Sequence, residues 1–349
     1  MFVKIKKSSL FTKETLSVLS VKSFFPQGQI LLNISDLPKI QAFEPDNSLQ
    51  NLGPTQKASN SEYSSTEIPN PPAIPEDADN EKHASNEKTY KIIESQFGQA
   101  GLKYENFCVK NTSGTEIDIA KELSLKPDVC IKKSGEPQVL IYHTHTSESY
   151  LKKDEGFFYE SYYPRSTDGS RNVTKVGEEI AKKLNEHGIV TIHDTTYHDS
   201  PTYKGSYSRS CKTIRENLDK YPSIQVTIDI HRDSMGSPES GKVKPTFRIN
   251  GNKAAQIMVV AGCDKDGSAE FPDWEYNLRL ALRVQQKCET MFPGLTRPMS
   301  FGNFRYNMNL SHGAMLIEVG SDVNTLGEAV YSGTLVGEAL AGVLNDLSK

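Results

Sequence analysis

The spacing of apolar positions after residue 138 predicts strands and helices in alternation. Continuous or alternating apolar runs indicate strands, and apolar residues three and four positions apart indicate amphipathic helices. The expected strands are Val139–Tyr142, Ile189–His193, Gln225–His231, Thr246–Ile249, Ile257–Ala261 and Ala314–Gly320. The expected helices pass through Val173–Leu184 and Ile214–Leu218, cover Trp274–Met291, and run from Thr325 to the C-terminus. This order predicts an α/β fold with an open, mainly parallel sheet flanked by helices.

Turn and capping residues mark the ends of several of these elements. Thr325 and Glu328 have the spacing of a capping box, which predicts the start of the last helix. The Asn250-Gly251 pair predicts a turn, and we expect it to join the fourth and fifth of the strands as a pair.

The first part of the chain lacks this alternation. Residues 1–42 begin with basic residues and continue into an apolar stretch that charged residues and Pro26 interrupt before it reaches the ~18 residues of a membrane span. We expect a weak or damaged membrane or export signal there. Residues 43–88 are rich in Pro, Ser, Asn, Asp and Glu and predict a disordered linker. Residues 89–136 are expected to form an accessory segment that packs on the edge of the main domain, residues 137–349.

Composition narrows the classes of protein that need to be considered. The 349 residues are 36% hydrophobic with a mean hydropathy of −0.52 and include 18 prolines, which fits one sizeable core plus a polar extension. A net charge of −4 gives no electrostatic reason to expect nucleic acid. The five cysteines form no Cys-x-x-Cys pair and are expected to be free thiols. The sequence also contains no nucleophile elbow, no P-loop and no dinucleotide-binding fingerprint.

Residues that can bind a metal stand where three of the expected strands end. One strand runs into His143, His145 and Glu148, a second ends on His231, and a third carries Glu318 near its end. The carboxyl ends of parallel strands line one crevice, so these side chains can converge despite their separation in sequence. Two imidazole nitrogens and one carboxylate oxygen are the ligand set of hydrolytic zinc sites that keep a fourth position open. We therefore predict that His145, Glu148 and His231 hold Zn²⁺.

The first histidine pair leaves two geometries open. In an ideal strand His143 and His145 share one face, but if the strand ends at His143, then His145 is free to turn toward a crevice with Glu148. His143 is accordingly an alternative ligand or an outer partner. Asp229 shares a strand face with His231 and is a second candidate for an outer partner that orients an imidazole.

Glu318 is the expected catalytic residue, because a carboxylate at the end of an apolar strand suits proton transfer to a leaving nitrogen. Arg232 follows His231 directly and is expected to bind a substrate carboxylate. Taken singly, a strand-end histidine is more typical of a hydrogen-bonded residue in the core or at the rim, and a strand-end glutamate is more typical of the surface. Their common position at strand ends is what favours a site. Three other histidines are expected at the surface or the rim: His187, His193 and His198.

Four motifs, in order, resemble the stage II sporulation protein P family of endospore-forming bacteria, which is related to zinc-dependent N-acetylmuramoyl-L-alanine amidases. The motifs are Ile141–Tyr150, Arg171–Val173, Asp229–Asp233, and Leu316–Gly320 followed by Asn324–Leu326. The likeness covers the chain from about Pro137 to the C-terminus.

The resemblance implies a peptidoglycan hydrolase of the engulfment machinery, which cuts the amide between muramic acid and the stem peptide and also the peptide cross-link. It implies stage II sporulation proteins D and M as partners, D being a lytic transglycosylase that prefers denuded glycan. It implies a location on the outer face of the mother-cell membrane, in the space between mother cell and forespore. The wider amidase family has a glutamate ligand near the start of its first helix, where this chain has Asn172. Glu148 is therefore the expected third ligand, and Asn172 is expected to bind substrate.

Two other functions stay open on the sequence alone. A non-catalytic cell-wall-binding or scaffold protein on the same fold would have no need of Glu318 together with both histidine sites. A zinc carboxypeptidase-like peptidase uses the same combination of His-x-x-Glu and a distant histidine. The sequence also leaves open which bond is preferred and which metal is bound in the cell.

Overall fold

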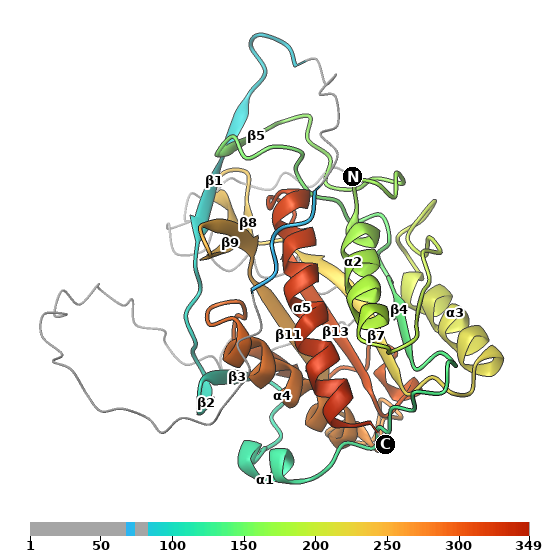
Figure 1. The fold of residues 1–349 in the computed structure, drawn as a ribbon. Helices are drawn as coiled ribbons and strands as arrows, with labels where there is room; N and C mark the ends of the chain where they lie inside the picture. The colour runs from blue at the N-terminus through green and yellow to red at the C-terminus, as the bar shows by residue number, and fades with distance from the viewer. Residues whose placement is uncertain (1–67, 74–82, 349) are drawn as a thin grey trace, which may run out of the picture. The chain divides into compact units, whose positions relative to one another are not determined.

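A computed structural model describes residues 68–73 and 83–348 of the chain (Figure 1). The signal expected in residues 1–42 and most of the linker expected at 43–88 lie outside these residues. Where the linker is described, Ile68 packs against the hydrophobic core, and the carbonyl of Pro69 accepts a hydrogen bond of 3.0 Å from Tyr331. This short stretch therefore differs from the expected disordered linker, because an apolar side chain and a main-chain acceptor both find partners on the folded body.

The centre of the fold is a mixed sheet of eight strands in the order β2-β3-β12-β11-β13-β7-β4-β6. β13, β7, β4 and β6 are parallel neighbours, β11 is antiparallel to β13, and β12 and β3 are parallel to β11. The predicted α/β fold with a mainly parallel sheet is confirmed. Part of the accessory segment, residues 89–136, supplies β2 and β3 at one edge of this sheet. The strands are β2 Leu102–Tyr104, β3 Phe107–Asn111, β4 Val139–Tyr142, β6 Thr191–His193, β7 Val226–Asp233, β11 Ile257–Gly262, β12 Met299–Gly302 and β13 Ala314–Ser321.

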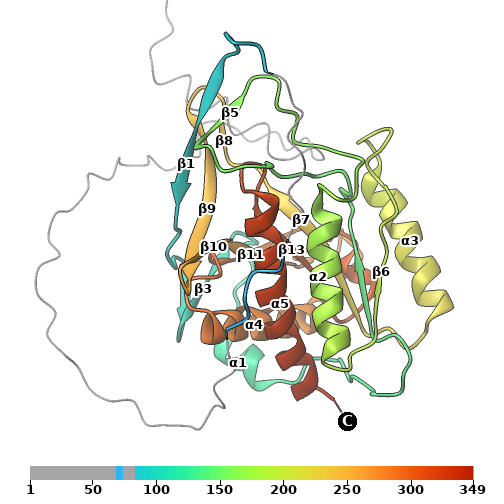
Figure 2. The ribbon, with the colours of Figure 1, turned by 45° about the horizontal axis from the view of Figure 1, so that its top comes forward.

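Helices cover both faces of the sheet. α2, α4 and α5 share one hydrophobic cluster with alternate residues of the central strands, among them Ile141, Ile230 and Ile317. α2 and α5 lie side by side (Figure 1 and Figure 2). α3 packs on the opposite face against Leu140 and Tyr142. Apolar residues on both faces explain why these strands are continuous apolar runs in the sequence. The helices are α1 Ile119–Ser124, α2 Val173–Glu186, α3 Ser206–Lys220, α4 Trp274–Met291 and α5 Leu326–Asp346, with a short 3₁₀ helix, η4, at Met308–Leu310.

The capping box predicted at the start of the last helix is present. The Thr325 side chain accepts a hydrogen bond from the Glu328 amide, and the Glu328 carboxylate accepts one from the Thr325 amide. Within the described part of the chain, no helix combines the length and apolar character that a bilayer crossing requires. All five cysteines are free thiols, as expected.

A second, smaller sheet was not expected from the sequence. It has the order β10-β9-β1-β5, with β8 paired to β9. Asn250 and Gly251 have φ angles of 48° and 79° and form the predicted turn, in the left-handed conformation of a tight hairpin. The strands are β1 Thr89–Ser95, β5 Phe157–Tyr159, β8 Gly236–Ser237, β9 Gly241–Ile249 and β10 Asn252–Ala255.

The partner expected across this turn is wrong. β9 pairs with β10, whereas the expected partner forms β11 in the main sheet. Gln256, between β10 and β11, is fixed by three hydrogen bonds. Its side-chain nitrogen donates to the carbonyls of Phe97 (3.0 Å) and Gly294 (2.9 Å), and its side-chain oxygen accepts from the main-chain N–H of Phe97 (2.6 Å). The chain therefore leaves one sheet and enters the other at a single buried residue.

Candidate metal centre and active site

The register of the central strands brings two of the expected site residues together. β7 and β13 are parallel with His231 directly opposite Glu318, and Asp229 lies opposite Tyr142 of β4. Side chains alternate between the faces of a strand, so Asp229 and His231 lie on the face opposite to Ile230, which packs with α2 and α5. The side chain of Glu318, paired with His231, lies on that same face.

The two histidines after β4 point to different sides of the sheet. The strand ends at Tyr142, and His143 continues its alternation toward α2, where its Nδ1 bonds the Ile230 carbonyl (2.9 Å) and its Nε2 bonds His193 Nε2 (2.8 Å). His145 lies in the loop and turns to the face of His231, with the two rings edge to face and their centroids 5.2 Å apart. Both ring nitrogens of His143 are thus used within the fold, and of the two geometries left open the loop geometry is the one found.

Glu148 completes the cluster. Its Oε2 lies 3.6 Å from His231 Nδ1 and accepts a hydrogen bond of 3.1 Å from the Arg232 amide, and its Oε1 lies 3.6 Å from an Arg165 nitrogen. The three expected ligands are therefore neighbours. His145 Nδ1 is buried without a hydrogen-bond partner in the described part of the chain, which suits a nitrogen that binds a metal.

As they stand, no three histidine, cysteine, aspartate or glutamate side chains in residues 68–73 and 83–348 are positioned to hold a metal ion. Two of the three expected ligands, His145 and Glu148, nevertheless have the charge that a metal ligand needs. Burial holds the pKa of His145 down at about 4, so this imidazole is neutral. Burial alone would raise the pKa of Glu148, but Arg232 and His231 outweigh it and keep that pKa below its ordinary value. The site thus contains an ionised carboxylate and a neutral imidazole at neutral pH.

Asp229 supports His231 from the sheet. Its carboxylate accepts hydrogen bonds from the amide (2.8 Å) and hydroxyl (2.6 Å) of Thr144, and its Oδ1 lies 2.9 Å from His231 Nε2. The contact between Asp229 and His231 is an ion pair without the geometry of a hydrogen bond, since Nε2 has no aligned acceptor among the described residues. Against the effect of burial, Asp229 raises the pKa of His231 to about 10. The negative charge behind His231 therefore fixes the orientation of its ring and favours a positive charge there, either a proton or a cation.

Glu318 has the properties of a residue that exchanges protons. The side chain is half-buried, and its Oε2 is buried with no hydrogen-bond partner among residues 68–73 and 83–348. Burial and the nearby Asp233 carboxylate raise its pKa to about 8, although His231 opposes the change. A carboxyl group with such a pKa can give up and regain a proton near neutral pH.

Two residues expected to bind substrate have structural roles instead. The Arg232 guanidinium is buried and donates to the carbonyls of Ser149 (3.1 Å) and Pro164 (2.5 Å). Asn172 is 0% exposed and caps α2, accepting from the Thr174 amide (3.0 Å) and donating to the Ser166 carbonyl (2.9 Å). Both side chains are buried, and their donors are used by main-chain carbonyls of Ser149, Pro164 and Ser166.

Several residues near the site were missed from the sequence. Arg165 donates to Asp199 (2.6 Å), and its guanidinium lies 4.9 Å from the ring centroid of Tyr203. Tyr203 in turn stacks on His145 with ring centroids 4.5 Å apart, and its hydroxyl lies 3.0 Å from His145 Nε2. Tyr207, four residues further on, meets His145 edge to face at 5.7 Å. The four-residue spacing of the two tyrosines was the only local signal for this aromatic wall.

His198 was expected at the surface or the rim, which is wrong. Only 1% of it is exposed, and its ring bonds the His143 carbonyl (2.7 Å) and the Thr213 hydroxyl (2.8 Å). His198 thus joins the end of β4 to α3. These segments are far apart in the sequence, and no local sequence pattern predicts the contact.

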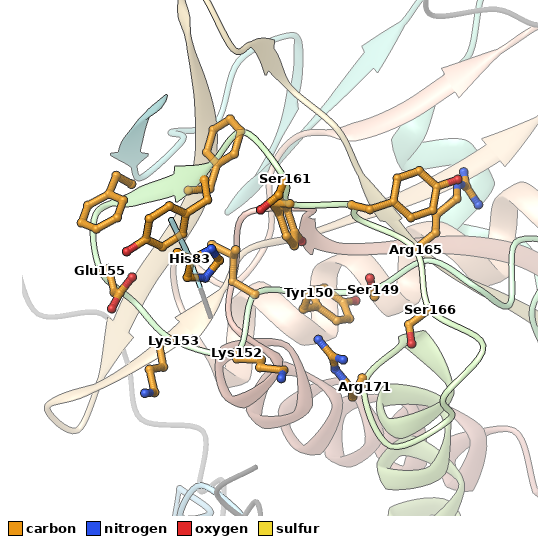
Figure 3. A pocket seen from close by; sticks show the side chains of 16 residues that line it. His83, Ser149, Tyr150, Lys152, Lys153, Glu155, Ser161, Arg165, Ser166 and Arg171 are labelled. Carbon is orange, nitrogen blue, oxygen red and sulfur yellow. The ribbon is translucent and has the colours of Figure 1, made fainter. Parts of the chain in front are cut away.

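A cavity of about 430 Å³ borders the cluster (Figure 3). Ser149 and Tyr150, which follow Glu148 directly, form part of its wall, and Arg165 stands between the cavity and Glu148. The Tyr150 hydroxyl donates to the carbonyl of Val319, next to Glu318, with a distance of 3.0 Å. The segment that carries one candidate ligand is therefore also a wall of the cavity.

Fold and site together define an α/β protein with a centre of histidines and carboxylates at the carboxyl ends of neighbouring parallel strands. The chain belongs to the stage II sporulation protein P family, whose model matches residues 27–341. It is 29% identical over 222 residues to stage II sporulation protein P of Bacillus subtilis (strain 168), an alignment that covers 60% of this chain and 52% of that protein. The chain thus spans about half the length of the curated relative it matches. The resemblance inferred from the motifs is confirmed.

The solved structures that match the chain include N-acetylmuramoyl-L-alanine amidases. AmiC2 of Nostoc punctiforme matches with 15% sequence identity and a TM-score of 0.34, over 61% of this chain and 97% of that chain. The amidase of Clostridium difficile 630 matches with 18% identity and the same TM-score and coverage.

Proposed function

We propose that this protein is a metal-dependent peptidoglycan hydrolase that acts in sporulation. The observation that carries the proposal is the meeting of His145, Glu148 and His231 beside Glu318, from three strand ends far apart in the sequence. A wall-binding protein would need none of these polar groups to be buried together, and burying them is unfavourable unless a function requires it. Membership of the stage II sporulation protein P family supports the process in which the activity is used.

Zn²⁺ is the metal that best fits the donors. His145, Glu148 and His231 would hold it, and Nδ1 of His145, which has no hydrogen-bond partner among the described residues, is an atom that a metal would satisfy. When bound, zinc supplies the Lewis acidity that activates water and polarises an amide carbonyl. His145 is already neutral, and Glu148 already ionised, so only His231 has to lose a proton for the three ligands to bind.

The remaining residues orient groups and move protons. Glu318 takes the proton of the attacking water and returns it to the leaving nitrogen, the two steps that a carboxyl group with a pKa near neutrality performs well. Asp229 keeps the ring of His231 in place and stabilises positive charge on it. Arg165, held by Asp199, keeps Glu148 ionised from the side of the cavity.

The bond we assign first is the amide between muramic acid and the stem peptide, with cleavage of the peptide cross-link as an additional activity. Stage II sporulation proteins D and M are the partners we propose, and the outer face of the mother-cell membrane during engulfment is the location. All three assignments come from the family likeness rather than from any contact in the described residues.

Digestion of purified peptidoglycan by the full-length chain tests the proposal. We expect soluble fragments that disappear with a chelator and return with zinc. Glu318→Gln should lower the rate by about 10²–10⁴-fold, while Glu186→Gln on the outer surface of α2 should leave it unchanged. Mass spectrometry separates the candidate bonds, because free stem peptides report amidase activity and split cross-links report endopeptidase activity. Digestion that persists in chelator, or that is unaffected by Glu318→Gln, would show the proposal to be wrong.

A further inference from the structure

A turn between β12 and η4 has a backbone conformation that few residues adopt. Its residues Tyr306 and Asn307 have φ angles of 41° and 60°, in the left-handed region. Asparagine is enriched in this conformation, but a bulky residue such as tyrosine is rarely found there. Such strain persists only where the surrounding contacts enforce it, and it is concentrated at functional sites. The contacts of this turn lead to the candidate metal centre.

Asn307 begins a network of buried hydrogen bonds that ends behind His231. Its side-chain nitrogen donates to the Ser210 hydroxyl (3.0 Å), and the hydroxyls of Ser210 and Thr144 lie 2.8 Å apart. The single proton of Thr144 goes to the Asp229 carboxylate (2.6 Å), the stronger acceptor, so Ser210 donates at the contact between the two hydroxyls. Asp229 Oδ1 in turn lies 2.9 Å from His231 Nε2. All the donors of this network therefore point toward the carboxylate, and hydrogen bonds aligned in this way strengthen one another.

The network is shielded from water and extends beyond what the helix itself requires. Ser210 and Thr144 are 0% exposed, and Asn307 is 9% exposed. A serine buried in a helix can satisfy its hydroxyl on a carbonyl of the same helix, and Ser210 has such an acceptor, the Tyr207 carbonyl, at 3.2 Å. The additional contact between Ser210 and Thr144 is therefore the one that connects α3 with the metal centre.

The same turn reaches the second candidate histidine through aromatic rings. Tyr306 stacks on Phe304 and on Tyr207, with ring centroids 4.5 Å and 5.2 Å apart. Tyr207 meets His145 edge to face at 5.7 Å. Asn307 also holds the main chain of Tyr207, because its side-chain nitrogen donates to the Tyr207 carbonyl (2.9 Å). One strained turn thus has contacts that lead to both imidazoles of the centre.

We propose that the turn at Tyr306 and Asn307 positions the two candidate histidine ligands for the metal. The inference rests on the proposed metal-dependent function and adds to it residues that lie outside the ligand set. Asn307 acts on His231 through the hydrogen-bond network, and Tyr306 acts on His145 through the stacked rings. Groups behind the ligands set the orientation of each ring, and a metal binds more tightly when that orientation exists before it arrives.

Calorimetric titration of the full-length chain with zinc tests the proposal. Two substitutions interrupt the hydrogen-bond network at different points. Ser210→Ala removes the hydroxyl at its middle, and Asn307→Gly removes its first donor while tolerating the left-handed backbone. We expect each variant to bind zinc about tenfold more weakly than the unaltered chain, the smaller of the effects typical for partners of metal ligands.

Each substitution has a matched control away from the centre. Ser332→Ala on α5 also removes a helical hydroxyl that is 0% exposed, where it donates to the Ala255 carbonyl (2.6 Å). Asn250→Gly replaces an asparagine with a φ of 48° in an exposed turn. Both controls should bind zinc as the unaltered chain does. Unchanged zinc affinity in Ser210→Ala and Asn307→Gly would overturn the proposal. An equal loss in Ser332→Ala would also overturn it, because that result indicates a general effect of lost stability.

Measurements on the metal-free chain separate this inference from the function on which it rests. NMR of the His231 ring nitrogens and hydrogen exchange of the Thr144 amide, which donates to Asp229 (2.8 Å), both report on the network. In Ser210→Ala we expect a shifted ring signal and about tenfold faster exchange of this amide.

The two failures have different signatures. If the unaltered chain binds zinc and digests peptidoglycan, but zinc affinity, ring signal and amide exchange are unchanged in the variants, the positioning proposal is wrong and the hydrolase stands. If the ring signal and the amide exchange change in Ser210→Ala while the unaltered chain binds no zinc, the ring of His231 is positioned as proposed and the metal-dependent hydrolase is wrong.

Discussion

Replacing Glu318 by glutamine should change how the stability of the metal-free protein depends on pH. In the folded chain the pKa of Glu318 is raised from its ordinary value of 4.5 to about 8, chiefly by burial and by the Asp233 carboxylate. The unfolded chain exposes the group to water and returns the pKa to its ordinary value. Between these two values the folded state holds a proton that the unfolded state has lost, so stability decreases as the pH rises and the loss is complete above about pH 8.

The size of the stability change follows from the same shift in the pKa of Glu318. A change from 4.5 to about 8 corresponds to at most about 5 kcal/mol. Glu318 is only half-buried, and solvent screening reduces this figure to about 1–3 kcal/mol. Glutamine does not ionise, so the variant has no proton to lose at this position. The variant should therefore be as stable as the unaltered chain near pH 5 and more stable by about 1–3 kcal/mol near pH 9.

Urea unfolding at pH 5, 7 and 9, in the presence of a chelator, measures the difference. Glu186→Gln is the control, because a hydrogen bond from Lys183 lowers the pKa of Glu186, and its contribution is constant above pH 5. His231 also lowers stability as pH rises from its unfolded value of 6.5 toward about 10 in all three proteins. Glu318 is one of the charges that raise the pKa of His231, so the attraction between the two groups is lost in the Glu318 variant, and we expect a difference toward the lower end of the range at pH 9. Parallel curves for the Glu318 variant and the unaltered chain would refute a raised pKa, and with it the proton-transfer role of this residue.

Three other substitutions test the surroundings of the site. Gly177→Ala should lower the free energy of unfolding by about 1–3 kcal/mol despite a better helix propensity, because the added methyl would lie 2.6 Å from His193 Nε2; chemical denaturation measures it. Lys244→Met should lower the free energy of unfolding by about 3 kcal/mol, because it removes the buried positive charge that compensates the carboxylate of Glu328. An unchanged thermal unfolding temperature would contradict this expectation. Tyr203→Ala should weaken zinc binding by about tenfold in a calorimetric titration, and Tyr203→Phe by less, since the phenylalanine ring can still stack on the first candidate ligand.

The sequence was sufficient to predict those parts of the fold that depend on local patterns. Periodic apolar positions located α2, α4 and the central strands, because each of these elements buries one face or both faces along its own length. The convergence of His231 and Glu318 was also predictable, since parallel strands align their carboxyl ends. The second sheet could not be predicted. β1 pairs with β9, which lies far along the chain, and backbone hydrogen bonds between the two strands produce no pattern in the side chains of either segment.

The roles of individual polar residues were harder to predict than their positions. Arg232 donates to the carbonyl of Ser149, next to Glu148, and Asn172 donates to the carbonyl of Ser166. A sequence shows that a side chain can bind an anion or a carbonyl, but it does not show which of these partners the fold places beside it. Arg165 is the opposite case, since it follows no strand and was missed, yet it connects Glu148 with the cavity.

The two carboxylates of the site have pKa values displaced in opposite directions, and this division supports a catalytic centre over a structural ion-pair cluster. Arg232 and His231 keep Glu148 ionised, as a metal ligand must be, whereas burial and Asp233 favour the protonated form of Glu318. A cluster selected only for stability would pair Glu318 with a cation, as Asp199 is paired with Arg165. Instead, the buried Oε2 of Glu318 has no hydrogen-bond partner among the residues that the structure describes. An unpaired acid beside an ionised ligand lowers stability, and a hydrolase that must both accept and return a proton gives a reason for that arrangement.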